Sequence, residues 1–193
     1  MDELDDATRR TAEVATAVRD DDLEATTPMD SPVRAVLQHL LGLSIAFRDA
    51  AAKVDGPTTS TPPQPIDDPL PEDWRAQVTE RLDDLARAWH EPTAREGMTK
   101  AGGVELPGEV AVLVALDEVL LHGWDIARAT GQDYAPSDAE CDAVLPVVSP
   151  SAEVPDGSDR AGLFGPVVVV PDGAPYFDRV LGLAGRDPGW RPS

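Results

Sequence analysis

A chain of 193 residues, 41% of them hydrophobic, is long enough to form one well-packed domain and too short to require two. Its 16 basic and 36 acidic residues give a formal net charge of −20, which repels nucleic-acid phosphates and anionic lipids and so excludes both as expected partners. The chain opens with acidic and polar residues and has no apolar run near the roughly 20 residues that span a bilayer, so we expect a soluble, cytoplasmic protein.

Helical spacing of apolar residues predicts two helices in the first third of the chain. The first is expected over residues 2–23, with charged side chains opposite its apolar face. The second is expected from Ser31 and Pro32, a cap and first-turn pair, to about Val54. Residues 55–71 are rich in proline, cannot continue a helix, and are predicted to form a long exposed connection.

Two further helices are predicted in the middle of the chain. Apolar spacing resumes at Glu72 and stops at Pro92, which indicates a third helix. Residues 96–108 are rich in glycine and of mixed polarity, and we expect a loop there. The fourth helix is expected to begin near Glu109, whose charge suits a first turn, and to end at Gly131.

The last third of the chain predicts shorter elements. Ser137 and Glu140 have the spacing of a capping box, which indicates a short fifth helix to about residue 148. Four consecutive valines at 167–170 predict a short strand, and residues 175–184 a last short helix.

Together these elements predict an all-α protein. Four main helices and a long crossover between the second and third are typical of an antiparallel four-helix bundle. We expect the bundle over residues 1–150. Residues 151–193 are expected to form a short irregular C-terminal extension packed on the bundle, not a separate domain.

The fourth predicted helix carries three ionisable side chains on a stripe that is otherwise apolar. Glu118, His122 and Asp125 follow one another at spacings of four and three, which places them within an arc of about 60°. Ionisable groups on a buried face are costly unless they pair with one another or bind a metal. The stripe therefore predicts either a metal site or a buried hydrogen-bonded network.

His39 is the candidate partner from another helix. It projects from the apolar face of the second predicted helix, whereas His90 lies beside a proline and is expected to be solvated. His39, Glu118 and His122 supply two imidazoles and one carboxylate, the donors of a catalytic zinc site with an open fourth position. Nickel, iron or manganese suit the same donors. Spacing alone leaves open whether Glu118 or Asp125 reaches the metal.

The single cysteine, Cys141, excludes an intrachain disulfide and a thiolate-rich zinc site. Its neighbours Asp138, Glu140 and Asp142 are acidic, which disfavours a thiolate. We expect an unreactive helix position there.

Three stretches resemble a known family. TPMDSPVRAVLQHLLG, the E-x-x-x-H-G-W-D pattern from Glu118 to Asp125, and the closing GRDPGW resemble an actinobacterial branch of the DinB-like superfamily. That branch is related to the N-terminal domain of mycothiol-dependent maleylpyruvate isomerase. The resemblance implies a four-helix bundle that holds a divalent metal, usually zinc or nickel, through His39, Glu118 and His122. Some relatives activate a low-molecular-weight thiol, such as mycothiol or bacillithiol, and deliver it to an electrophile, and others have no assigned activity.

The function expected from this resemblance is that of a thiol-dependent metalloenzyme, an S-transferase or isomerase with mycothiol as a possible co-substrate. The chain lacks the isomerase's separate C-terminal domain, so maleylpyruvate itself is not the expected substrate. The alternative is a non-catalytic metal-binding bundle with a stress or regulatory role. The sequence assigns no catalytic residue.

Supporting roles are predicted for the remaining polar residues. Glu118 is assigned to the metal because its side chain is longer and helical side chains lean toward the N-terminus. Asp125 is expected to accept an imidazole N–H and fix its tautomer. Arg34 and Arg128 are candidates for holding an anionic substrate. The fourth helix is apolar over most of its circumference, and its expected exposed strip is narrow, limited to Asp117 and Arg128 with Trp124 beside them. We therefore expect a homodimer that pairs through helix faces.

Overall fold

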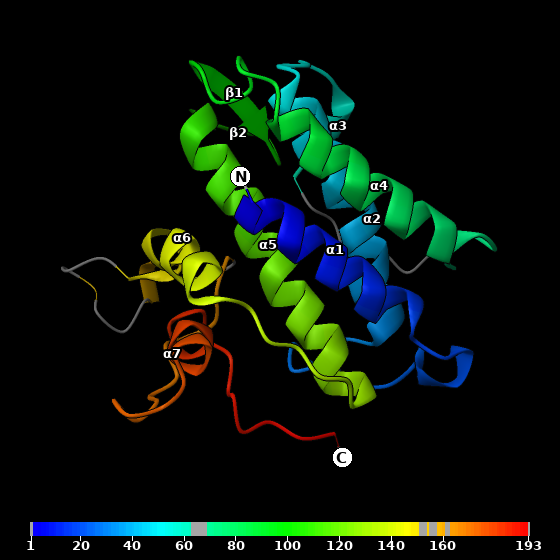
Figure 1. Cartoon of the computed structure of the whole chain (residues 1–193), viewed down its shortest axis with the longest axis vertical. Coiled ribbons are helices and arrows are strands. Elements are labelled where there is room, and N and C mark those ends of the chain that lie inside the picture. Colours follow the sequence, from blue (N-terminus) through cyan, green and yellow to red (C-terminus); the bar gives the residue numbers. More distant parts are fainter. Residues whose placement is uncertain (1, 63–68, 151–153, 155–157, 161–162, 193) are drawn as a thin grey trace.

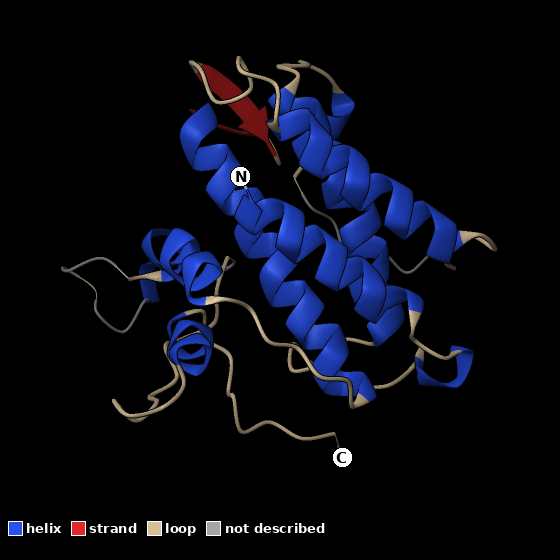
Figure 2. Cartoon of the chain, in the orientation of Figure 1, coloured by secondary structure: helices blue, strands red, loops and turns tan. Residues whose placement is uncertain are grey.

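The computed structural model describes residues 2–62, 69–150, 154, 158–160 and 163–192. Within these residues the chain forms seven α-helices, two short 3-10 turns and one two-stranded sheet (Figures 1 and 2). The protein is therefore mostly helical, as predicted. No helix among the described residues is long and apolar enough to cross a membrane.

Four long helices form the main body. They are α1 (Asp2–Thr16), α2 (Val33–Ala51), α4 (Trp74–Trp89) and α5 (Gly108–Thr130). Helices α1 and α2 each pack against both α4 and α5, so every long helix has two long neighbours. The apolar stripes meet between them and bury large side chains, which include Leu4, Leu37, Leu40, Leu82, Leu85, Trp89, Leu120 and Leu121.

Helix α1 ends seven residues earlier than predicted, at Thr16. The 3-10 turn η1 (Asp20–Asp22) follows it. Three consecutive aspartates are unfavourable at a helix C-terminus, where the dipole favours positive charge. Arg75 of α4 supplies that charge instead, because its guanidinium donates to the carbonyl of Val18 at 2.7 Å and to Asp20 at 2.7 Å.

The start of α2 differs from the predicted cap. The N-cap residue is Pro32, with no side-chain cap, and the Ser31 hydroxyl lies 3.3 Å from that of Thr27. The helix ends at Ala51, close to the predicted end, where Lys53 takes a φ of +58°. The proline-rich connection includes a one-turn helix, α3 (Pro57–Ser60), and its residues 63–68 lie outside the described chain.

The prediction of a loop at 96–108 is wrong, because these residues contain a β-hairpin. Strands β1 (Met98–Ala101) and β2 (Val104–Pro107) pair antiparallel at one end of the long helices. Gly102 and Gly103 connect them with φ of +56° and +82°. A two-residue turn with two positive φ values is the turn whose twist matches paired strands, and glycine adopts it without strain.

The predictions for the next two helices are confirmed. Gly131 ends α5 in the left-handed conformation, with a φ of +69°. Helix α6 (Asp138–Val148) begins with the predicted capping box: the Glu140 N–H donates to the Ser137 hydroxyl at 3.3 Å, and the Ser137 N–H donates to the Glu140 carboxylate at 2.7 Å.

The C-terminal region contains a helix as predicted, but not the predicted strand. Helix α7 (Tyr176–Leu183) lies within the expected range. Residues 167–170 pair with no strand in the described part of the chain, and the Val168 N–H donates instead to the carbonyl of Gly182 at 2.9 Å. A Cβ on Gly182 would lie 2.6 Å from the Val168 carbonyl oxygen, so glycine permits this approach. Val168 and Val170 therefore lie against helix α7, whereas Val169 is exposed.

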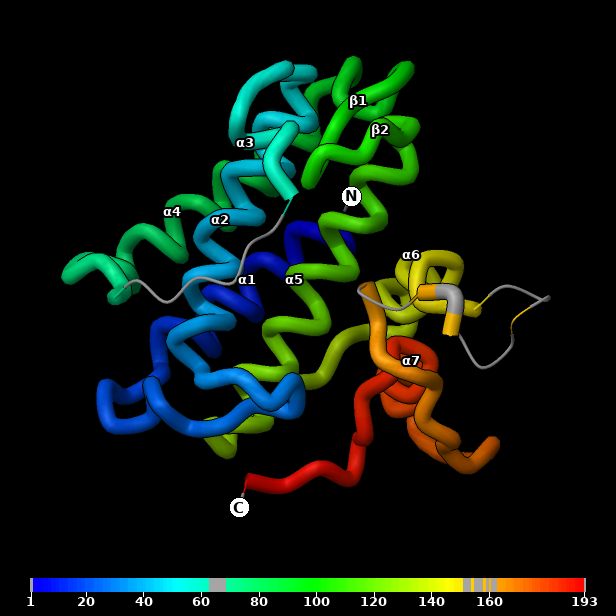
Figure 3. Tube along the Cα trace, turned by 180° about the vertical axis from the view of Figure 1, so that it is seen from behind, coloured from blue at the N-terminus to red at the C-terminus, as the bar shows by residue number. Residues whose placement is uncertain are grey.

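Helices α6 and α7 and the C-terminal tail lie on one side of α5 (Figure 3). Asp117 and Trp124 are buried beneath this cover, with 3% and 6% of their surface exposed. Arg128 donates to the carbonyls of Trp190 and Pro188, both at 2.9 Å. The prediction that this strip of α5 is exposed is therefore wrong, because α6, α7 and the C-terminal tail cover it. A homodimer stays a prediction without an assigned surface.

At Gly123, helix α1 and Tyr134 come close to the backbone of α5. The Thr11 hydroxyl of α1 donates to the Val119 carbonyl at 3.1 Å and lies 3.0 Å from the Tyr134 hydroxyl. A Cβ on Gly123 would collide with both hydroxyls. This glycine allows α1 and Tyr134 to pack directly on the backbone of α5.

Candidate metal centre

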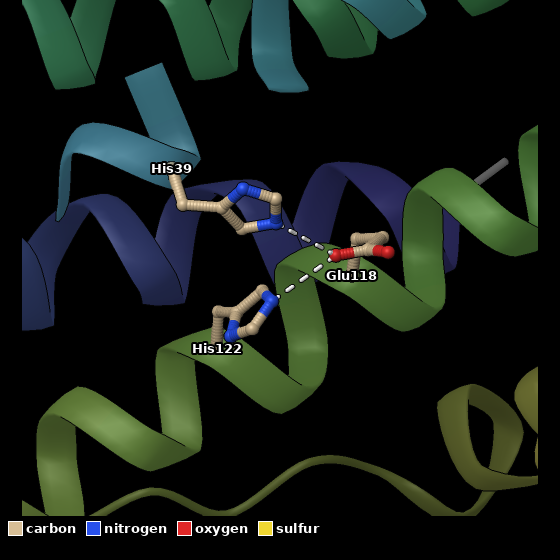
Figure 4. A group of neighbouring side chains, drawn as sticks. All are labelled: His39, Glu118 and His122. Carbon is tan, nitrogen blue, oxygen red and sulfur yellow. Dashed lines mark hydrogen bonds and ion pairs between the residues drawn. The ribbon is translucent and has the colours of Figure 1, made fainter. Parts of the chain in front are cut away.

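Three side chains predicted from the sequence meet between α2 and α5 (Figure 4). The Glu118 Oε2 atom lies 3.3 Å from His39 Nε2 and 3.1 Å from His122 Nε2. The two imidazole rings meet edge to face, with centroids 4.8 Å apart. Both rings thus direct a nitrogen at one carboxylate oxygen.

These three residues fit a divalent metal by spacing and by donor type. One donor atom from each of His39, Glu118 and His122 can be chosen so that all lie within 4.8 Å of one another. Tetrahedral zinc with bonds of about 2.0–2.1 Å separates its donors by roughly 3.4 Å, close to the two shorter distances observed. A small closing movement of the rings would place all three around one ion.

Asp125 lies behind His122, not within the three-residue cluster. Its Oδ2 atom is 3.2 Å from His122 Nδ1. An N–H at Nδ1 that donates to this carboxylate leaves Nε2 with a free lone pair facing Glu118. Asp125 therefore contacts the His122 nitrogen that faces away from Glu118, and the Glu118 carboxylate lies within 3.3 Å of both Nε2 atoms.

Electrostatics in the cluster favour ion pairing in the absence of a metal. Burial opposes ionisation of His122, but hydrogen bonds to Asp125 and Glu118 outweigh it and raise its pKa to about 9. Burial likewise opposes ionisation of Glu118, and hydrogen bonds from His122 and His39 hold its pKa well below the usual range. A metal ion binding here at neutral pH would displace a proton from His122.

The cluster is more open than the apolar stripe suggested. The side chains of His39 and Glu118 are 29% and 32% exposed, and that of His122 is 14% exposed. The prediction that His39 points into core is therefore only partly right. This exposure allows a small molecule to approach the cluster from solvent.

The two arginines predicted to hold a substrate have other partners. Arg34 donates to Glu24 at 2.8 Å, and Arg128 is held by the C-terminal tail. His90 is half-exposed, as expected, and lies 2.9 Å from Asp5. Cys141 is buried, and burial together with its acidic neighbours raises its thiol pKa to about 11. None of these four residues contributes to the cluster.

Two buried ionisable residues near the cluster were not predicted. Arg186, in the C-terminal tail, is 5% exposed and binds Asp125. Asp117 is 3% exposed, and its Oδ1 has no hydrogen-bond partner among the described residues. Helical spacing marks Asp117 as outward-facing, so only the cover formed by α6 and α7 explains its burial. The GRDPGW motif contained Arg186 but gave no spatial information.

Asp117→Asn is expected to stabilise the metal-free protein increasingly as pH rises. Burial raises the pKa of Asp117 from 3.8 to about 8, and the charge of Glu118 acts in the same direction. The folded chain therefore binds this proton more tightly than the unfolded chain, and the associated stability is lost as pH rises from about 4 to 8. Asparagine carries no charge to bury. At pH 8 we expect a gain of about 1–2 kcal/mol, or roughly 2–8 °C in melting temperature.

Melting temperatures of chelator-treated protein at pH 5 and pH 8 would test this. Asp133→Asn, at an exposed position, changes net charge equally and should have little effect. An equal gain at both pH values would contradict the titration of a buried carboxyl.

No protein-family model, curated protein or solved structure matches the chain. Functional assignment therefore depends on the arrangement of His39, Glu118 and His122.

Proposed function

We propose that His39, Glu118 and His122 hold a divalent metal, with zinc the best fit and nickel the next. The observation that supports this most directly is the meeting of two imidazole nitrogens at one carboxylate oxygen, although His39 and Glu118 lie 79 residues apart in sequence. Two nitrogens and one oxygen leave a fourth tetrahedral position for another ligand. The partial exposure of His39 and Glu118 provides access to that position.

We further propose that the protein is a thiol-dependent enzyme that transfers a low-molecular-weight thiol, such as mycothiol, to a small electrophile or isomerises that electrophile. A divalent metal held by these residues would act as a Lewis acid and would lower the pKa of a bound thiol. The residues of the chain provide and orient the metal ligands. Glu118 contributes a negative charge, and Asp125 accepts the Nδ1 proton of His122, which keeps the Nε2 lone pair available for the metal.

The proposed family is the DinB-like superfamily, and the proposed architecture is its four-helix bundle. Support comes from the contacts of α1 and α2 with both α4 and α5, and from the long connection between α2 and α4. Support also comes from the cluster, whose residues are those that the resemblance assigned to the metal.

Metal content and thiol transfer would test the proposal together. The purified protein is analysed for bound metal, then stripped with a chelator and reloaded with zinc or nickel. Transfer of a small thiol to a chromogenic electrophile is measured at each step. We expect activity to disappear on stripping and to return on reloading. His39→Ala should lose both metal and activity, whereas His90→Ala, which changes a histidine outside the cluster, should keep both.

The alternative function predicts a different result in the same experiment. A non-catalytic metal-binding protein would lose thermal stability on stripping but transfer no thiol to any electrophile. A cluster that serves only as a hydrogen-bonded network would contain no metal, and its melting temperature would not change with chelator.

A further inference from the structure

Arg186 in the C-terminal tail contacts Asp125, the residue that lies behind His122 of the metal cluster. The Arg186 guanidinium donates to Asp125 Oδ2 at 2.9 Å through Nη2, and through Nε to Oδ1 at 3.1 Å and Oδ2 at 3.3 Å. Arg186 is 5% exposed and Asp125 fully buried. The contact therefore joins the C-terminal tail to the last third of α5, away from solvent.

The backbone at the end of α7 places this arginine. Gly185 has a φ of +76°, its N–H donates to the Gly182 carbonyl at 3.1 Å, and the Arg186 N–H donates to the Leu181 carbonyl at 2.9 Å. This pair of hydrogen bonds is a Schellman motif, which reverses the chain direction after a helix. Gly185 also lies against Gly165, where a Cβ would come within 2.6 Å of backbone atoms. The turn thus requires glycine at position 185, and it fixes the position of the Arg186 backbone.

The guanidinium fork fixes the plane of the Asp125 carboxylate. With both oxygens held by Arg186, Oδ2 is left facing His122 Nδ1 at 3.2 Å. That hydrogen bond in turn directs His122 Nε2 at Glu118. Without the fork, the carboxylate could rotate about its Cβ–Cγ bond and His122 would lose a fixed partner. Partners behind a metal-binding imidazole typically change metal affinity 10- to 100-fold.

We propose that Arg186 is a positioning residue for the metal centre, which it serves by holding Asp125 against His122. This inference rests on the proposed metal function. It assigns Arg186 a part in the site although this residue lies 61 positions beyond Asp125 in sequence.

Zinc affinity in a double-mutant cycle would test the proposal. Competition with a chromogenic chelator is measured for the wild-type protein, Arg186→Met, Asp125→Asn and the double variant. We expect Arg186→Met to weaken zinc binding by roughly 10- to 100-fold. The double variant should bind no more weakly than Asp125→Asn alone, because Arg186 acts through Asp125. Arg186→Lys, which keeps the charge but loses the fork, should recover part of the loss.

A matched control separates this role from general support of the C-terminal region. Arg160 also ties that region together, through the carbonyls of Val148 and Leu183, but does not contact Asp125. Arg160→Met should therefore leave zinc affinity unchanged. The visible spectrum of the cobalt-substituted protein gives a second readout: its bands should shift in Arg186→Met and Arg186→Lys, but not in Arg160→Met. If Arg186→Met does not fold, the zinc affinity and the cobalt spectrum of Arg186→Lys are compared with those of the wild type and of Arg160→Met.

The outcomes distinguish the two proposals. A wild-type protein that binds neither zinc nor nickel overturns the metal centre and this inference with it. Tight binding by the wild type, with equal affinity in the Arg186 variants, overturns only the role of Arg186. Losses that add in the double variant would also overturn it, since they would show that Arg186 acts independently of Asp125.

Discussion

Glu118→Gln is expected to abolish tight zinc binding, whereas Asp125→Asn should weaken it by only about 10- to 100-fold. The Glu118 carboxylate lies 3.1 Å from His122 Nε2 and 3.3 Å from His39 Nε2. Glutamine at this position would remove its negative charge. Asp125 reaches only the far nitrogen of His122. Competition with a chromogenic chelator at neutral pH measures both affinities.

The same helix offers a control for the glutamate substitution. Glu109→Gln changes an exposed residue in the first turn of α5 and should leave zinc affinity unchanged. A greater loss from Asp125→Asn than from Glu118→Gln would show that the two carboxylates have the opposite roles.

Arg10→Ala is expected to lower the free energy of unfolding by about 3 kcal/mol, which corresponds to roughly 6–12 °C in melting temperature. Arg10 donates to both oxygens of Glu140, at 2.7 and 2.8 Å. The Glu140 side chain is fully buried, so alanine at position 10 would leave a buried carboxylate without its cation. The hydrogen bonds that Glu140 keeps with Ser137 limit the loss.

The neighbouring Arg9 provides the control. Its side chain is 60% exposed, and ion pairs at exposed positions contribute about 0–1 kcal/mol, so Arg9→Ala should change the melting temperature little. Both substitutions alter net charge equally. Adding Glu140→Gln to Arg10→Ala should recover part of the stability, because it removes the unpaired charge. Equal effects at positions 9 and 10 would contradict a buried ion pair between α1 and α6.

The features that the sequence predicted correctly depend on residues close together in the chain. The capping box of Ser137 with Glu140 and the end of α5 at Gly131 follow from local backbone chemistry. The grouping of Glu118 with His122 follows from one turn of helix. Only His39 required a contact between helices, and its position on an apolar face indicated that contact.

The features that the sequence did not predict depend on contacts between distant segments. Asp117 lies on the side of α5 that the long helices leave open, so its burial comes from α6 and α7. The valines at 167–170 have high strand propensity, but the Val168 N–H donates to a carbonyl of α7 instead of to a neighbouring strand. The failure to predict the β-hairpin has a different cause. Gly102 and Gly103 were a local signal for a two-residue turn, and the prediction of a loop did not use it.

The contact at Gly123 has a geometric consequence for the neighbouring His122. Successive residues of an α-helix differ in direction by about 100°, so a rotation of α5 by a single position would turn His122 and Glu118 away from His39. Such a rotation would also bring a side chain to the point where Thr11 and Tyr134 now meet a bare backbone. The one position on this helix turn without a side chain thereby sets the angle of α5 about its own axis, and with it the direction in which the two donors face α2.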